Sequence, residues 1–310
     1  MKKVIKRLIH PYLVTKLLWR KNINIFIKYA KGRIVDFGCF DFCLSKDFQP
    51  KANEFYGIDN WVASNCHRLA PEGARFYYAN IEKSPFKDSS FDMVICTDVL
   101  EHVENPDALL SECYRVLKKN GKLILSIPFN FFLHGAPNDF RRYTIYGLER
   151  ILKEKGFVLK EYCITGDIFY TILIHLITYF YFSYIKATNR IKRYICAIFH
   201  LCLNILGIIA VKYFSRGKVY KDTSPSINDR THPVGYVLMA EKEKGEENEE
   251  LTEEEILVCP DCHSKLNFLE DRIICNNCGK TYKYYEGIPV LAEKEMLHLE
   301  YEAINKKIDF

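Results

Sequence analysis

The sequence predicts an α/β fold, in which a doubly wound, mostly parallel sheet carries a helical apolar insert and is followed by a small C-terminal metal-binding ribbon. Three observations support this prediction. Short apolar stretches that favour strands alternate with helical stretches between residues 31 and 167. Two runs of 18 residues without a charged side chain follow them. Two Cys-x-x-Cys pairs near the C-terminus have a spacing typical of metal ligands.

The elements of the main domain can be assigned in chain order. Helices are predicted at 105–121, where Asn-Gly would end the helix, and at 143–157. The last predicted strand returns to the sheet only after the apolar insert. Strands are predicted at 33–37, 54–59, 75–78, 91–100, 122–129, 158–165 and 234–243.

These elements divide the chain into seven segments. We expect an N-terminal basic amphipathic helix, the main domain, the apolar insert, a return to the main domain, an acidic linker, the ribbon and a C-terminal tail. The linker is too charged to be buried. In chain order, the segments are 1–30, 31–167, 168–218, 219–243, 244–255, 256–292 and 293–310.

The charge is unevenly distributed along the chain. Residues 1–240 have a net charge of +14, whereas residues 241–310 have a net charge of −9. A basic body indicates an anionic partner, either a membrane surface or a nucleic acid. Eight of the twelve cysteines are scattered outside the Cys-x-x-Cys pairs, mostly in apolar segments, which fits a reducing cytoplasm. No apolar run near the N-terminus is long enough for a signal peptide.

The two uncharged runs, 168–185 and 194–211, would form helices about 27 Å long, close to the thickness of a bilayer core. The segment between them, 186–193, carries four positive charges, which disfavours a spanning hairpin because both outer ends join one domain. A hairpin lying in an anionic membrane interface fits better. A lid, or a homodimer surface, remains an alternative. The polar stripe Thr171, His175 and Thr178, like the pair His200 and Asn204, is expected to satisfy its own hydrogen bonds.

Four motifs resemble those of the seven-stranded, class I SAM-dependent methyltransferases, which have a Rossmann-like fold. The resemblance covers roughly residues 30–165 and the strand at 234–243, and it implies S-adenosylmethionine (SAM) as cofactor. The motifs are VDFGC (35–39), YGIDN (56–60), ANIEKSPFKDSSFDMVICTDVLEHVENP (79–106) and YRVLKKNGKLILSIPF (114–129).

The resemblance also implies a set of cofactor-binding residues at the carboxyl ends of the strands. Gly38 would contact the methionine part of SAM at a sharp turn, which Asp36 would anchor, and Asp59 would accept the ribose hydroxyls. Asn80 and Ile81 would hold the adenine, and Thr97 would stand at the mouth of the pocket. The set is Asp36, Gly38, Asp59, Asn80, Ile81 and Thr97.

Phe40 and Phe42 stand where such loops usually have glycine. We expect the loop to be wider, or the methionine end of the cofactor to be displaced. A degenerate loop blocked by Phe40 would make the chain a non-catalytic scaffold.

The stretch HGAPNDFRRYT (134–144) resembles a signature, HG-x-P-x-DF-x-R-[YF]-T, of a subset of these methyltransferases. His134 is the candidate base, because an imidazole takes up a proton near neutral pH. Asp139, Arg142 and Tyr143 are candidate substrate-binding residues. The alternative is that His134 and Asp139 only tie the loop to Arg142 and Tyr143. Glu101-His102 is expected to open a helix.

Four cysteines in the pattern C-x₂-C-x₁₂-C-x₂-C predict a structural zinc ribbon. A segment this short needs the metal for stability. Residues 256–292 also resemble a small zinc-ribbon family that activates tRNA and translation-factor methyltransferases, which implies that the ribbon covers an apolar surface of the catalytic domain. Its balanced charge gives no support for direct contact with nucleic acid. The ligands would be Cys259, Cys262, Cys275 and Cys278.

The sequence therefore predicts a cytoplasmic methyltransferase on the inner face of the membrane. Its acceptor would be a polar group on a lipid-linked glycan or similar intermediate. An RNA or translation-factor methyltransferase with a built-in activator, and a non-catalytic scaffold, are the alternative hypotheses.

Overall fold

The computed structural model describes residues 10–40, 42–60, 66–215, 217–221, 232–245 and 251–292. The strands are β1 Arg33–Phe37, β2 Glu54–Asp59, β3 Arg75–Ala79, β4 Phe91–Thr97, β5 Leu117–Pro128, β6 Phe157–Thr165, β7 Val219–Tyr220, β8 Gly235–Lys242, β9 Leu266–Phe268, β10 Ile273–Cys275, β11 Thr281–Tyr285 and β12 Ile288–Leu291. The α-helices are α2 Leu13–Ile23, α3 Pro106–Val116, α4 Ile145–Glu154, α5 Ile168–Lys186, α6 Arg190–Tyr213 and α7 Glu253–Ile256. Short 3₁₀ helices are η1 Asn24–Tyr29, η2 Gln49–Lys51 and η4 Cys66–Leu69.

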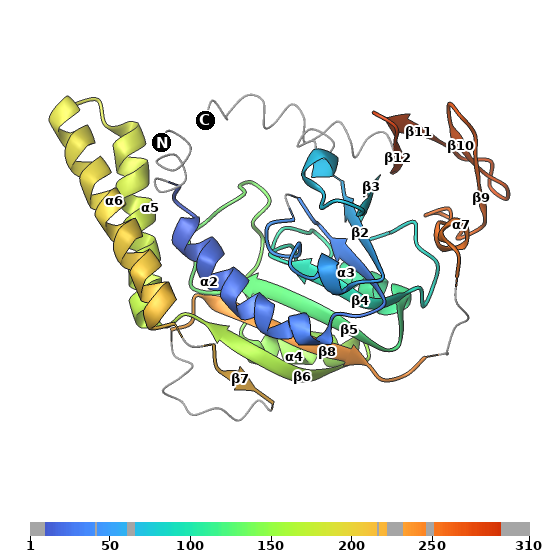
Figure 1. The fold of residues 1–310 in the computed structure, drawn as a ribbon, viewed down its shortest axis with the longest axis horizontal. Coiled ribbons are helices and arrows are strands. Elements are labelled where there is room, and N and C mark those ends of the chain that lie inside the picture. Colours follow the sequence, from blue (N-terminus) through green and yellow to red (C-terminus); the bar gives the residue numbers. More distant parts are fainter. Residues whose placement is uncertain are drawn as a thin grey trace.

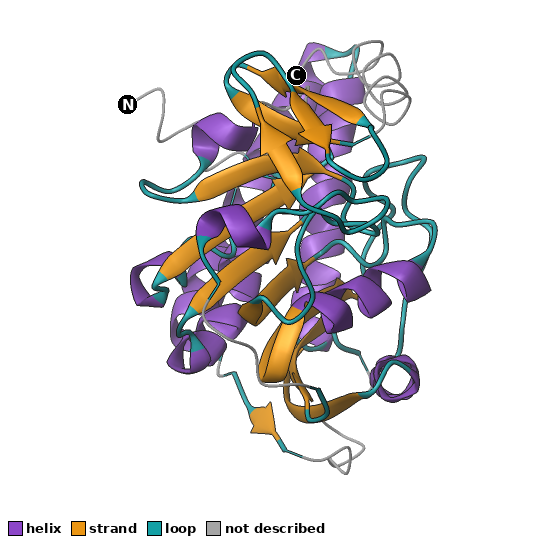
Figure 2. Ribbon diagram, turned by 90° about the vertical axis from the view of Figure 1, so that its right-hand side faces the viewer, coloured by secondary structure: helices purple, strands orange, loops and turns teal. Residues whose placement is uncertain are grey.

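The strands form one sheet in the order β7-β6-β8-β5-β4-β1-β2-β3-β12-β11-β10-β9. Strands β1 to β5 run parallel, and β8 lies antiparallel between β5 and β6. Helices lie on both sides of the sheet (Figure 2). The predicted Rossmann-like, doubly wound and mostly parallel sheet is confirmed.

Each face of the sheet has its own apolar core. One core joins the strands to α3, α4 and the ribbon, and includes Leu109, Leu148 and Phe86. The other joins the strands to α2, η1, α5 and α6, and includes Leu18, Phe26 and Ile174. The alternation of side chains along each buried strand therefore serves two cores at once.

The first predicted helix is shorter than the sequence suggests. It was expected to reach the Asn-Gly pair at 120–121, but α3 ends at Val116 and β5 begins at Leu117. Leu117 is fully buried and pairs with Phe91 of β4. The Lys242 ammonium donates hydrogen bonds to the carbonyl oxygens of Tyr114 (2.8 Å) and Leu117 (2.7 Å), so tertiary contacts satisfy the helix end.

The ribbon continues the main sheet. Strand β12 pairs parallel to β3, with Val290 opposite Tyr78, and Leu257 forms a bridge with Phe86. The Lys87 N–H donates to the Ile256 carbonyl over 2.8 Å. The ribbon thus covers an apolar part of the main domain, as the sequence resemblance implies.

Helices α5 and α6 form a hairpin that projects from the opposite end of the molecule from the ribbon (Figure 1). Helix α2 packs against the base of this hairpin. A Cβ on Gly207 of α6 would lie 2.4 Å from Val14 Cγ2 of α2, so the two helices approach closely there. The Lys21 ammonium also donates to the Val211 carbonyl over 2.9 Å, at the end of α6.

Most described polar groups of the hairpin have hydrogen-bond partners, chiefly backbone carbonyls. His175 Nδ1 lies 2.7 Å from the Thr171 carbonyl, and the Thr178 hydroxyl donates to the carbonyl of Ile174. Within α6, His200 Nε2 lies 3.0 Å from Asn204 Nδ2, and His200 Nδ1 lies 3.0 Å from the Ile177 carbonyl of α5. The hairpin therefore satisfies most of its polar groups internally, although Asn204 Oδ1 has no hydrogen-bond partner among the described residues and many large apolar side chains are exposed.

The segment boundaries proposed from the sequence remain predictions. The expected N-terminal helix of residues 1–30 contains α2 and η1, and its residues 1–9 lie outside the described part of the chain. Parts of the expected return segment (222–231) and linker (246–250), and the tail (293–310), also lie outside it.

Candidate functional site

The carboxyl ends of the parallel strands bring four predicted residues to one edge of the sheet. Strand register places Phe37 beside Ile58, and Ile58 beside Tyr77. The positions that follow or end these strands therefore share that edge. They are Gly38 after β1, Asp59 at the end of β2, Asn80 after β3 and Thr97 at the end of β4.

The turn after β1 requires glycine at its first position. Gly38 has a φ of +73°, and a Cβ there would lie 2.6 Å from Val99 Cγ2. The Gly38 N–H donates to the Ile58 carbonyl over 2.9 Å. The Phe40 N–H donates to Asp59 Oδ2 over 3.0 Å. These contacts tie the turn to the end of β2.

Phe40 and Phe42 adopt the left-handed backbone that glycine usually provides, with φ of 39° and 53°. Phe42 is 1% exposed and packs on the α2 face of the sheet beside Phe55 and Phe76. A Cβ on Gly57 would lie 2.4 Å from Phe42 Cζ. The Phe42 ring therefore fills the core below the sheet and not the edge where the cofactor is expected.

The other predicted cofactor residues are also held in place. Asp36 is buried and accepts a hydrogen bond from the Ser45 hydroxyl. Asn80 Oδ1 accepts the Glu82 N–H over 2.8 Å, and Ile81 is buried. A carboxylate, an amide and an apolar side chain along one edge are the groups that a ribose and an adenine ring need. The described residues fit the expected cofactor.

The loops after β4 and β5 bring three side chains together. His134 Nε2 lies 3.2 Å from His102 Nε2, and each of these nitrogens lies 3.7 Å from Glu101 Oε1. We call these three residues the Glu101 cluster. Glu101 is fully buried, whereas both imidazoles are partly exposed. The expected helix does not begin at Glu101-His102, because α3 starts only at Pro106.

Contacts with Asp139 orient His134. Its Nδ1 lies 3.2 Å from Asp139 Oδ2, which also accepts the His134 backbone N–H over 2.9 Å. Arg142 binds both oxygens of Asp139. These hydrogen bonds outweigh burial and lower the pKa of Asp139 to about 2. Burial lowers the pKa of His134, so its imidazole is neutral at pH 7.

The fourth residue predicted for the acceptor side lies elsewhere. Tyr143 packs against the core shared by α3 and α4, and its charged neighbours are Arg141 and Asp107. The structure therefore brings His134, Asp139 and Arg142 together without Tyr143.

Two carboxyl groups of this region were not predicted as functional. Burial raises the pKa of Asp98 and of Glu101 to about 7 each, and the negative charge of Glu101 also raises the pKa of Asp98. Asp98 has a φ of +54° and accepts a hydrogen bond from Ser126 Oγ over 2.7 Å. The sequence contains the signal, since TDVLEH (97–102) places both acids directly after an apolar strand.

The loop after β5 (residues 129–144), which the sequence predicts to be the acceptor-side loop, lies against the hairpin. Phe131 and His134 have ring centroids 5.1 Å apart, and Phe132 and His175 of α5 have centroids 6.4 Å apart. Phe132 also lies 6.3 Å from His134, between ring centroids, and thus connects the Glu101 cluster with α5.

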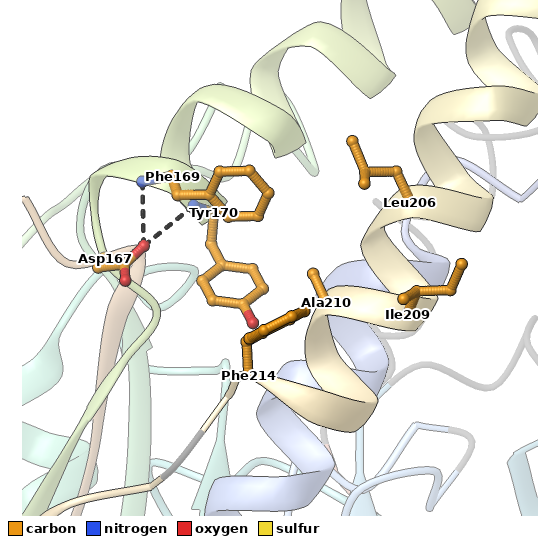
Figure 3. A pocket seen from close by; sticks show the side chains of 7 residues that line it. All are labelled: Asp167, Phe169, Tyr170, Leu206, Ile209, Ala210 and Phe214. Carbon is orange, nitrogen blue, oxygen red and sulfur yellow. Dashed lines mark hydrogen bonds between the residues drawn. The ribbon is translucent and has the colours of Figure 1, made fainter.

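A cavity of about 370 Å³ lies at the hairpin root (Figure 3). Asp167 caps α5 there by accepting the N–H groups of Phe169 and Tyr170 over 3.0 and 3.2 Å. The cavity wall is mainly apolar. It consists of Asp167, Phe169, Tyr170, Leu206, Ile209, Ala210 and Phe214.

The four ribbon cysteines come together as the spacing predicts. Their sulfur atoms all lie within 4.8 Å of one another, with 3.7 Å between Cys259 and Cys278 and 3.4 Å between Cys262 and Cys275. Four thiolates around a tetrahedral zinc ion would be about 3.8 Å apart, because each Zn–S bond is about 2.3 Å. The sulfur positions fit zinc.

Two family models match the chain. Residues 35–125 match a model described as a methyltransferase domain, and residues 255–283 match one described as Trm112p-like protein. The first match spans β1 to β5, and the second spans the four cysteines.

Among curated relatives, an uncharacterized protein of Methanocaldococcus jannaschii is 35% identical over 114 residues, which cover 36% of this chain and 53% of that protein. The ubiquinone biosynthesis O-methyltransferase of Dechloromonas aromatica is 28% identical over 138 residues, which cover 42% of this chain and 56% of that protein. The chain spans about half the length of the curated relatives it matches.

Solved structures are similar at lower identity. A complex between the Haloferax volcanii Trm112 methyltransferase activator and a methyltransferase has a TM-score of 0.39 at 17% identity, covering 44% of this chain and 66% of that chain. A SAM-dependent methyltransferase of Thermotoga maritima has a TM-score of 0.47 at 16% identity, covering 74% and 92%.

Proposed function

We propose that this chain, which joins a class I SAM-dependent methyltransferase domain to a Trm112-like domain, methylates a polar group on a membrane-bound acceptor. The observation that carries the proposal is the contact between the acceptor-side loop and an exposed apolar hairpin. A lipid-linked glycan or a similar intermediate is the acceptor class that this arrangement fits.

On the cofactor side, SAM supplies an electrophilic methyl group when it is bound. Asp59 would accept the ribose hydroxyls, and Asn80 with Ile81 would hold the adenine ring. Gly38 would allow the backbone to lie close to the methionine part. Asp36 would act through Ser45 to anchor the turn, and Thr97 would stand at the pocket mouth. Together they would fix the direction in which the methyl group points, which is the main requirement of an in-line displacement.

On the acceptor side, His134 is the candidate base. The carboxylate of Asp139 faces its Nδ1, which would keep the proton on that nitrogen and direct Nε2 toward Glu101 and His102. Since the lowered pKa keeps His134 neutral, Nε2 can accept a proton from an acceptor hydroxyl at pH 7. Arg142 would position Asp139 and contribute positive charge beside the acceptor.

The hairpin would place this site at the cytoplasmic face of a membrane. Helices α5 and α6 are both long and apolar enough to cross a bilayer, and only about 30% of each is buried. Apolar side chains such as Phe169, Ile198 and Phe214 are 46–77% exposed. Basic side chains at the tip would meet anionic headgroups. They are Lys186, Arg190, Lys192 and Arg193.

A second candidate function follows from the Trm112-like domain. Its family resemblance favours an RNA or translation-factor substrate, and the basic body would attract such a substrate. In that case the hairpin would serve as a lid or a dimer surface. The two candidates differ in what the purified protein binds, lipid vesicles or tRNA.

The test is a transfer assay with isotopically labelled SAM on lipid, RNA and protein fractions of a cell extract. We expect label in the lipid fraction and tight SAM binding by calorimetry. Asp59→Asn should weaken SAM binding by at least about tenfold, since one charged hydrogen bond is worth about 1.5–3 kcal/mol. Asp271→Asn, on the exposed surface of the ribbon, is the matched control.

Label in the RNA or protein fraction would establish the second candidate. Absence of SAM binding at millimolar concentration would mean that the chain is a scaffold and not an enzyme.

A further inference from the structure

We propose that Glu101, His102 and His134 bind one divalent transition-metal cation beside the acceptor, at a site separate from the four ribbon cysteines. The three donor atoms are Glu101 Oε1 and the two Nε2 atoms, which lie 3.2 to 3.7 Å from one another. Neighbouring ligands of a cation with bonds of about 2.0–2.2 Å lie roughly 3.0–3.6 Å apart. The three atoms are therefore nearly in place for coordination.

The carboxylate of Glu101 gives independent support. Its side chain is fully buried, and neither of its oxygens has a hydrogen-bond partner on another residue among the described residues. A buried carboxylate without a partner is costly, and proteins rarely keep one without a ligand. Glu101 Oε1 points toward both imidazoles, and a cation would fill the position between these three donor atoms.

The two imidazoles present lone pairs toward the same point. His102 Nδ1 lies 2.5 Å from the Asn138 carbonyl oxygen, so this nitrogen must carry a proton and donate it. His134 Nδ1 lies 3.2 Å from Asp139 Oδ2, close to a negative charge but without hydrogen-bond geometry. The two Nε2 atoms face each other only 3.2 Å apart, an arrangement that a shared cation stabilises. Metal-binding histidines are commonly held by such outer hydrogen bonds.

The donor set also selects the cation. Two imidazoles and one carboxylate favour Mn²⁺, Fe²⁺, Co²⁺ or Zn²⁺ over Mg²⁺ and Ca²⁺, which prefer oxygen ligands. Three protein ligands leave positions open for an acceptor oxygen.

The consequence for catalysis depends on the proposed function, whereas metal binding itself does not. A hydroxyl bound to the cation loses its proton to solvent more readily, because the cation lowers the pKa of a bound O–H group. The acceptor oxygen then forms its bond to the methyl carbon as the carbon–sulfur bond of SAM breaks, which releases S-adenosylhomocysteine. In this arrangement His134 is a ligand and not the base, and the favoured acceptor group is a hydroxyl.

The probe is Mn²⁺, titrated into the full zinc-loaded chain and followed by electron paramagnetic resonance. We expect one equivalent to bind, with nitrogen coupling from imidazole in the pulsed spectrum and zinc content unchanged. His102→Gln, His134→Gln and Glu101→Gln should each weaken Mn²⁺ binding at least about tenfold, as loss of a metal ligand or its support does. His175→Gln is the matched control and should bind Mn²⁺ like the wild type.

Several outcomes would overturn the proposal. These are no Mn²⁺ binding at 1 mM in about 0.1 M salt, no imidazole coupling, or equal binding by His102→Gln and His175→Gln. SAM binding and circular dichroism of each variant show whether it is folded, and Glu101→Gln keeps the size of the side chain. If Mn²⁺ binds but no fraction is methylated, the proposed function fails and the metal site stands. If methylation occurs without Mn²⁺ binding, the metal site fails alone.

Discussion

Replacing Gly38 by alanine tests whether the turn after β1 depends on its close contact with Val99. The φ of +73° costs an L-residue about 1–2 kcal/mol. The new Cβ would lie 2.6 Å from Val99 Cγ2 and 3.1 Å from Val99 Cγ1, and overpacking of this kind costs about 1–3 kcal/mol. We therefore expect Gly38→Ala to lower the free energy of unfolding by roughly 2–5 kcal/mol.

A double-mutant cycle with Val99→Ala separates the two contributions. Val99 is 8% exposed, and removing its two methyl groups should cost about 1–3 kcal/mol. In the double variant the clash is gone but the backbone strain remains. It should therefore be about 1–3 kcal/mol more stable than the sum of the single effects predicts. Urea unfolding of the zinc-loaded chain, followed by circular dichroism and fluorescence, gives the four free energies.

The same variants also report on the cofactor site. The turn holds Asp59 through the hydrogen bond from the Phe40 N–H, so a displaced turn should move this carboxylate. Loss of one hydrogen bond to a charged group costs about 1.5–3 kcal/mol, which corresponds to roughly 10–100-fold in the Kd for SAM. Additive free energies in the cycle, combined with unchanged SAM affinity of Gly38→Ala, would refute the reasoning.

Three further predictions concern the hairpin, the ribbon and α2. Replacing the four tip cations with glutamine should weaken binding to phosphatidylserine vesicles by about 1 kcal/mol per charge in a sedimentation assay. Equal loss after replacing Arg150 and Lys153 of α4 would contradict this. Cys278→Ser should lower the zinc content and Tm, since the metal stabilises the ribbon, whereas Cys202→Ser on α6 should change neither. Arg20 holds the pKa of Asp47 below its ordinary value. This partly exposed pair therefore stabilises the fold above the unfolded pKa of about 4 and loses its effect as the pH falls through the folded pKa. Asp47→Asn should cost about 0.5–1 kcal/mol at pH 7 and less as the pH falls below about 4, and a cost that does not change with pH would disprove it.

The sheet could be predicted because its signals are local. Each strand from β1 to β4 is a short, mostly apolar stretch, and β1 and β2 have the predicted bounds. The hairpin helices follow from two uncharged runs, and the predicted uncharged segments lie within α5 and α6. The ribbon cysteines follow from spacing alone.

The Glu101 cluster could not be predicted in the same way, because it depends on contacts between separate loops. Glu101 and His134 are far apart in the chain and meet only because β4 and β5 are neighbours in the sheet. The sequence of 101–116 favours a helix start at Glu101, but the buried carboxylate and the His102 contact with Asn138 hold an irregular turn instead. The position of the Phe42 ring could not be predicted either. The ring fits into the core only because Gly57, on the neighbouring strand, has no side chain.

The pairing of β12 with β3 has a consequence for how the protein is assembled in a cell. An activator supplied as a separate subunit must be found by diffusion, and its level limits how many enzymes are active. Here the ribbon and the catalytic domain share one polypeptide. The short linker between them gives the ribbon a local concentration of about 1 mM at the catalytic domain. Each molecule therefore carries its own ribbon at a fixed ratio of one to one. Rival enzymes cannot draw that ribbon away, and dilution cannot separate the pair.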